Sequence, residues 1–185
     1  MSVSRVLMWS LAVALVAWAA WLWPDVPARV PVHFGLDGQP DRWADRSVWS
    51  WFGLPLVGLA TAAGLDVVTR WALARPGAPG VNIPNKEAIL ALPPERRATV
   101  LAHVATTVYW AGVACLAAFA LIQADVWAVA HGAGTAPWTL AGVAVATVGP
   151  LAALVVGLAR TGAELERQWA AAAGWAGPES VGRRA

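Results

Sequence analysis

The sequence predicts an all-α integral membrane protein with four transmembrane helices, short interfacial helices and both termini in the cytoplasm. Only 13% of its 185 residues are charged and its mean hydropathy is +0.56, whereas soluble domains carry about 25% charged residues. The charges are also bunched, so that four long runs contain at most one charge each. Such runs are typical of helices that cross a bilayer.

The four predicted spans cover residues 6–23, 48–69, 98–122 and 138–160. The first is an uncharged run of eighteen residues, which as a helix would be about 27 Å long and close to the hydrocarbon thickness of a bilayer. It ends in Trp18, Trp21 and Trp23 instead of the small residues of a cleavage site. We therefore expect an anchor that stays attached and not a signal peptide.

The distribution of Lys and Arg predicts the orientation. Ten of the thirteen basic residues lie at the N-terminus, in the loop 70–97 or from residue 160 onward, and three lie in the loop 24–47. Because basic loops stay in the cytoplasm, the loop 70–97 and the tail 161–185 are predicted to be cytoplasmic, and the loop 24–47 to face outward. The protein is expected in the inner or plasma membrane.

Small residues are predicted to bring the helices together. Gly58 and Ala62 form a small-xxx-small pair in the second span, and Gly112 lies near the centre of the third; such residues allow close backbone approach in lipid. In the cytoplasmic loop, Lys86–Leu92 is predicted to be a short surface helix, and Pro94 to open the third span. The tail Ala163–Trp175 is predicted to be another interfacial helix.

Three polar side chains are predicted inside the membrane. Asp66 lies one turn from the inner end of the second span, Arg70 follows four residues later, and His103 should lie at a similar depth on the third span. A structural Asp66–Arg70 pair is one interpretation. The alternative is an Asp66–His103 contact that serves a proton or ion relay, because ionisable residues at such depth are often functional.

The loop between the first two spans is polar and rich in turns. It contains four potential ligands spaced every four residues: His33, Asp37, Asp41 and Asp45. A continuous helix would align them like a metal site, but Gly35, Gly38 and Pro40 argue against that helix. We expect consecutive turns around Asp37-Gly38, with Asp41 capping a helix that starts near Arg42 or Trp43.

Few features of the sequence indicate chemistry. It contains one cysteine, Cys115, and no HExxH, P-loop, nucleophile elbow or dinucleotide fingerprint, so the sequence predicts a non-enzymatic protein with no metal and no cofactor. The arginines flank apolar runs, which is the pattern of membrane topology and not of nucleic-acid binding. The expected partners are the lipid bilayer and either an extracellular peptide or another membrane protein.

The stretch "PARVPVHFGLDGQPDRW", Pro27 to Trp43, resembles the signature of the domain of unknown function 1648 (DUF1648). That family carries a proline-framed loop just after its first transmembrane helix. Six positions of this chain match its pattern: Pro31, His33, Phe34, Gly38, Pro40 and Asp41. Gly35 departs from it, because Asn or Asp often follows the aromatic residue. The later "NIPNK" and "LPPERR" are also similar to this family, and the resemblance extends over residues 3–122.

The resemblance implies a membrane domain without an assigned activity. The family is related to the N-terminal part of SdpI-type immunity proteins, which protect against a secreted toxic peptide and signal its presence. This implies a role in sensing, immunity or an accessory function, with the motif loop and its neighbours Arg42 and Trp43 as the contact surface. Two alternatives stay open: a small transporter or proton relay that uses Asp66, and a metal-dependent membrane enzyme.

Overall fold

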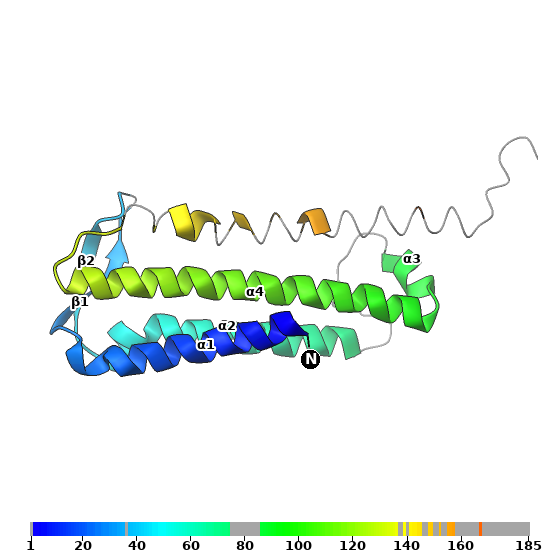
Figure 1. Ribbon diagram of the computed structural model, residues 1–185, viewed down its shortest axis with the longest axis horizontal. Helices are drawn as coiled ribbons and strands as arrows, with labels where there is room; N and C mark the ends of the chain where they lie inside the picture. The colour runs from blue at the N-terminus through cyan, green and yellow to red at the C-terminus, as the bar shows by residue number, and fades with distance from the viewer. Residues whose placement is uncertain are drawn as a thin grey trace, which may run out of the picture.

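In the computed structural model, three long helices lie side by side and a small β-hairpin sits at one end (Figure 1). The structure describes residues 2–35, 37–74, 86–136, 139, 141–145, 148–149, 152, 155–157 and 167. Its elements are α1 (Val3–Leu22), the 3-10 turn η1 (Trp23–Asp25), β1 (Arg29–Phe34), β2 (Pro40–Asp45), α2 (Val48–Ala74), α3 (Lys86–Ala91) and α4 (Pro94–Ala130). We call the end that carries β1 and β2 the hairpin end.

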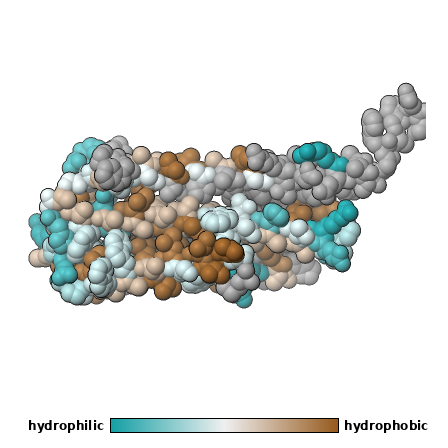
Figure 2. Space-filling view, viewed as in Figure 1, coloured by the Kyte–Doolittle hydropathy of each residue, from teal (hydrophilic) through white to brown (hydrophobic). Residues whose placement is uncertain are grey.

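The helices α1, α2 and α4 are each long and apolar enough to cross a membrane. Apolar side chains gather along the middle of the helices and polar ones at the two ends (Figure 2). Valines such as Val13, Val57 and Val67 are more than half exposed on the outside of the bundle, as expected for side chains that face lipid. The protein is therefore a mostly helical membrane protein.

Part of the predicted arrangement lies outside the described residues. Of the fourth span, 138–160, the described positions 139, 141–145, 148–149, 152 and 155–157 are helical. Residues 75–85 of the predicted cytoplasmic loop are not among the described residues, and of the predicted helix Ala163–Trp175 only Arg167 is.

The three long helices meet at small residues, as predicted. A Cβ at Gly58 would lie 3.1 Å from Leu116 on α4 and 3.4 Å from Leu15 on α1. A Cβ at Gly112 would lie 2.6 Å from the Met8 sulfur and 3.0 Å from Leu65 Cδ1. Glycine at these positions lets the backbones approach, which substitutes for the hydrophobic effect between helices in lipid.

The β-hairpin corrects the prediction of an all-α fold. The predicted helix start near Arg42 or Trp43 is also wrong, because both residues belong to β2. The helix α2 starts at Val48, and Ser47 caps it: Ser50 N donates to Ser47 Oγ at 3.1 Å, and Ser47 N donates to Ser50 Oγ at 2.9 Å. This reciprocal pair works like a capping box, and it takes the role predicted for Asp41.

The helix α3 and the start of α4 agree with the prediction. Ile89 is buried against residues of α4, and Pro94 is the first residue of that helix. At its other end α4 continues past the predicted span end at 122, because it reaches Ala130. Gln123 and Asp125, just beyond the predicted span end, are buried within the helix at 1% and 9% exposure.

Candidate functional site

The tip of the hairpin is closed by backbone bonds that need a glycine. Gly35 N donates to Gln39 O at 2.8 Å and Gly38 N donates to Gly35 O at 2.9 Å. Gly38 has a φ of 76°, in the left-handed region that other residues adopt at a cost. A Cβ at Gly35 would lie 2.8 Å from Asp37 Oδ1. The glycine that departs from the family pattern therefore makes room for a neighbouring carboxylate.

Register shifts on both sides of His33 bring its ring beside Asp41. The strands are antiparallel, with Pro31 opposite Trp43 and His33 opposite Arg42. His33 Nδ1 lies 2.6 Å from Asp41 Oδ1, and the two side chains are 56% and 53% exposed. The predicted motif residues His33 and Asp41 thus form a pair on the surface.

Arg46 links the hairpin by hydrogen bonds to the residues that follow α1. Its guanidinium donates to the carbonyl oxygens of Val26 and Trp23, each at 2.8 Å, and lies over the Trp23 ring at 4.3 Å from the centroid. Its backbone N–H donates to Ala28 O at 2.8 Å. Helix ends leave carbonyl groups without intrahelical donors. Arg46 supplies a donor to Val26 O and a second donor to Trp23 O, which also accepts from Val26 N at 3.3 Å. The sequence analysis counted Arg46 only as an outward charge.

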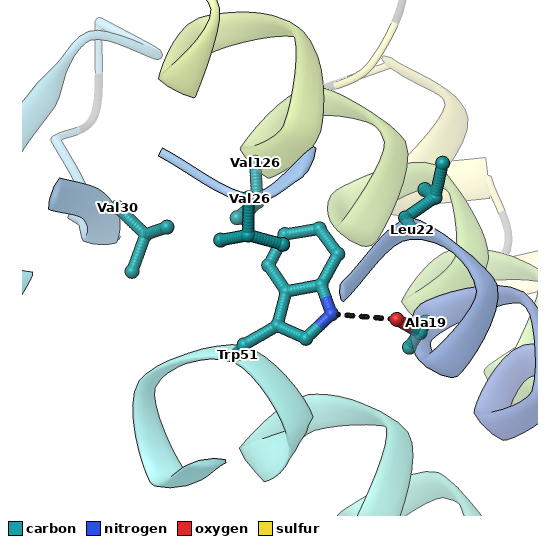
Figure 3. Packing of buried hydrophobic residues seen from close by; sticks show 6 residues of the cluster. All are labelled: Ala19, Leu22, Val26, Val30, Trp51 and Val126. Atoms are coloured by element: carbon teal, nitrogen blue, oxygen red, sulfur yellow. Dashed lines mark hydrogen bonds between the residues drawn. The ribbon is translucent and has the colours of Figure 1, made fainter. Parts of the chain in front are cut away.

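Trp51 also donates a hydrogen bond to a backbone carbonyl near the end of α1, but from inside the bundle (Figure 3). The Trp23 N–H donates to Ala20 O, which leaves Ala19 O to accept from Trp51 Nε1 at 2.8 Å. Trp51 is 1% exposed and packs with Val26, Val30 and Val126. This tryptophan therefore belongs to the core of the bundle and not to its outer surface.

The backbone carbonyl of Trp51 accepts a hydrogen bond from a side chain of another helix. Pro55 lies four residues later in α2 and has no N–H to donate. Gln123 Nε2 donates to Trp51 O instead, at 3.4 Å, which explains a buried glutamine in an apolar helix. A proline four residues after Trp51 is a signal in the sequence that could have pointed to this bond.

The motif residues divide into an anchoring set and an exposed set. Pro31 and Gly38 are buried, while Phe34 and Pro40 are partly buried. The exposed set, which we call the hairpin surface, consists of His33, Asp41, Arg42 and Trp43. The hairpin surface is a candidate contact site, because exposed polar and aromatic side chains on a fixed loop are suited to binding.

The structure does not align the four potential ligands His33, Asp37, Asp41 and Asp45 as a continuous helix would. Asp45 lies opposite Arg29 at the far end of the hairpin from Asp37. Among the described residues, no group of three or more His, Cys, Asp and Glu side chains is arranged to hold a metal ion.

A second polar cluster lies at the end of the bundle opposite the hairpin. Asp66 is 4% exposed and joins three helices: Arg5 Nε of α1 lies 2.7 Å from its Oδ1, and Tyr109 of α4 donates its hydroxyl to Oδ1 at 3.0 Å. Arg70 Nη1 lies 3.7 Å from Asp66 Oδ2, as the spacing predicted.

The expected Asp66–His103 contact is wrong. His103 is exposed, and its Nδ1 lies 3.3 Å from Thr99 O on its own helix. The sequence analysis missed Arg5 and Tyr109. One signal was available: Tyr109 is the only tyrosine of the chain, and a hydroxyl within an apolar span needs a partner.

A known family matches the part of the chain that contains the hairpin. Residues 10–59 match the family model described as Domain of unknown function (DUF1648). The resemblance inferred from Pro27–Trp43 is thereby confirmed over a shorter range than residues 3–122. No curated protein and no solved structure matches the chain.

The DUF1648 match covers a connected structural unit. It runs from the middle of α1 through η1 and the hairpin to the first half of α2. It therefore contains the hairpin surface together with Arg46 and Trp51, which attach the hairpin to α1. The buried cluster at the other end lies outside it, since Arg5, Asp66, Arg70 and Tyr109 are not among residues 10–59.

Proposed function

We propose that this protein is a four-span protein of the inner membrane, with both termini in the cytoplasm and the hairpin facing outward. The charge distribution supports this orientation, because ten of the thirteen Lys and Arg residues lie on the side that the positive-inside rule places in the cytoplasm. On this proposal its role is non-enzymatic: sensing, immunity or an accessory function at the outer face of the membrane.

The observation that carries the functional proposal is a rigidly attached hairpin with an exposed surface. Arg42 and Trp43 are consecutive exposed residues of β2, on opposite faces of the strand. Arg and Trp are among the residue types that contribute most at protein interfaces. The bonds of Arg46 to Trp23 O and Val26 O, at the two ends of η1, hold the hairpin before any partner arrives. A surface held in place in advance loses less entropy on binding.

We propose an extracellular peptide as the partner of the hairpin surface. The sequence resemblance to the N-terminal part of SdpI-type immunity proteins supports a peptide, and the exposed Trp43 offers it an apolar contact. Another membrane protein is the second partner class that the same surface could contact.

A protection assay tests the immunity role. A strain without the gene is exposed to medium conditioned by its parent strain, and survival is compared after complementation with the intact chain. We expect the deletion to lower survival and the intact chain to restore it. Equal survival of the deletion and parent strains would contradict a role in immunity.

Two variants then test the hairpin surface itself. Trp43→Ala and Arg42→Ala should accumulate in membranes at the normal level and fail to restore survival. The matched control is Trp49→Ala, because Trp49 is 79% exposed and lies just beyond the hairpin at the start of α2. Full restoration by Trp43→Ala and Arg42→Ala would show that the hairpin surface is not the contact site.

A further inference from the structure

A cavity lies between the hairpin tip and the end of α4. Its volume is about 210 Å³. Three segments wall it: the hairpin tip with Phe34 and Asp37, the end of α4 with Ile122 and Asp125, and the segment after α4 with Thr135 and Val143. Gln39 Nε2 donates to Thr135 Oγ1 at 3.2 Å and so links the tip to the third wall.

Two of the polar side chains that line the cavity are carboxylates, those of Asp37 and Asp125, and the other two are the hydroxyls of Thr135 and Thr139. Asp125 is 9% exposed, and its only hydrogen bond to a described residue is a long one of 3.4 Å from Ala136 N to Oδ1. Asp37 Oδ1 accepts from Gln39 N at 3.0 Å. Neither aspartate is within ion-pair distance of a basic side chain among the described residues.

A carboxylate enclosed in this way favours a cation. Burying a charge without a partner costs free energy, and the lining of the cavity around Asp125 is mostly apolar, so that few protein groups solvate the carboxylate. The wider surroundings have the same sign, because the hairpin end contains five aspartates, Asp25, Asp37, Asp41, Asp45 and Asp125, against the three arginines Arg29, Arg42 and Arg46. A cation would therefore be attracted to this end and stabilised at Asp125.

The size of the cavity limits the ligand. A cavity of about 150 Å³ accommodates benzene, so about 210 Å³ accommodates about eight non-hydrogen atoms. We propose that the cavity binds an amphipathic cation, in which a primary ammonium contacts Asp125 and a short apolar body contacts Phe34 and Ile122. A free alkylamine and the lysine side chain of a peptide share this chemistry. Use of such a ligand as a signal would rest on the function proposed above, but binding in the cavity does not depend on it.

The test measures binding of n-hexylammonium to the full chain in lipid nanodiscs by ligand-observed NMR, with empty nanodiscs as the correction for partition into lipid. Hexylammonium has seven non-hydrogen atoms and is compared with 1-hexanol and hexanoate. We expect hexylammonium to bind at least tenfold more tightly than hexanol and hexanoate not to bind. Equal affinity for hexylammonium and hexanol would overturn the proposal.

Variants assign the binding to the cavity. Asp125→Asn should weaken hexylammonium binding at least tenfold, whereas Asp45→Asn, an exposed aspartate outside the cavity, should change it less than twofold. Val143→Phe, whose larger side chain fills the cavity, should abolish hexylammonium binding. This variant tests the proposal if Asp125→Asn does not fold. Unchanged binding in the folded variants would overturn the proposal.

The peptide Ac-Leu-Lys-Leu-NH2 distinguishes the two sources of the ammonium. Binding of the peptide as tight as that of hexylammonium, and equally sensitive to Asp125→Asn, assigns the cavity to a lysine side chain. Binding of hexylammonium alone assigns it to a free amine. Loss of hexylammonium binding would leave the protection assay of the hairpin surface unaffected, so the two proposals fail separately.

Discussion

The substitution Trp51→Phe tests the role of the buried tryptophan in holding α2 against the end of α1. Trp51 is 1% exposed, and its Nε1 donates to Ala19 O at 2.8 Å. Phenylalanine keeps a ring in the cluster and removes the donor, so that the Ala19 carbonyl loses its side-chain partner. The variant is therefore expected to fold and to be less stable.

The loss of stability has two parts. A hydrogen bond contributes about 1 kcal/mol on balance, and about 0.6 kcal/mol on average between transmembrane helices. Phenylalanine is smaller than tryptophan by about 40 Å³, and at about 24 cal/mol per Å³ the unfilled space costs about 1 kcal/mol. The free energy of unfolding should therefore fall by about 2 kcal/mol.

The assay is SDS-induced unfolding in mixed micelles, followed by circular dichroism at 222 nm so that the loss of a fluorophore does not disturb the signal. The control is Trp49→Phe, because Trp49 is 79% exposed and exposed substitutions change stability by less than about 0.5 kcal/mol. If the two variants unfold alike, the bond from Trp51 to Ala19 does not stabilise the bundle and the reasoning is refuted.

Three further substitutions test other contacts. Gly112→Ala should destabilise the bundle by roughly 1–3 kcal/mol in the same unfolding assay, because the new methyl would lie 2.6 Å from the Met8 sulfur; Gly64→Ala, with nothing within 4 Å, should not. Arg46→Lys should cost roughly 1–2 kcal/mol, because a single ammonium cannot replace the fork that reaches several carbonyl groups, and an unchanged thermal midpoint by circular dichroism would contradict this. Asp66→Asn should weaken the bundle without altering proton flux into proteoliposomes; flux that the intact protein shows and the variant loses would instead establish the relay alternative.

The helices could be predicted because their signals are local. Long apolar runs and flanking charges marked α1, α2 and α4, and Pro94 marked the start of α4. The helix α4 ends later than predicted, at Ala130, because the polar residues Gln123 and Asp125 are buried within it. Their burial depends on partners elsewhere in the fold, Trp51 O for the glutamine and Ala136 N for the aspartate.

The hairpin could also have been predicted. Asp37-Gly38 is a common hairpin turn pair, and β-branched and aromatic residues precede it in "VPVHF". Pro31 argued against a strand, since proline cannot donate to a sheet ladder. In a sheet of two strands, however, each strand has a free edge, and β1 accommodates the proline.

Contacts between distant segments could not be predicted from local signals. The Asp66–Arg70 pair follows from the helical period and was predicted, but Arg5 and Tyr109 reach Asp66 from α1 and α4. Which face of each helix turns inward depends on small residues such as Gly58 and Gly112, whose neighbours only the packed bundle reveals.

Cysteine labelling in intact cells tests the central claim, an outward hairpin on a membrane-spanning bundle, most directly. In a Cys115→Ala background, one variant carries Asp37→Cys at the hairpin tip and another carries Glu95→Cys in the first turn of α4. A membrane-impermeant maleimide should label Asp37→Cys in intact cells and Glu95→Cys only after permeabilisation. Labelling of Glu95→Cys in intact cells, with Asp37→Cys protected until permeabilisation, would contradict the account.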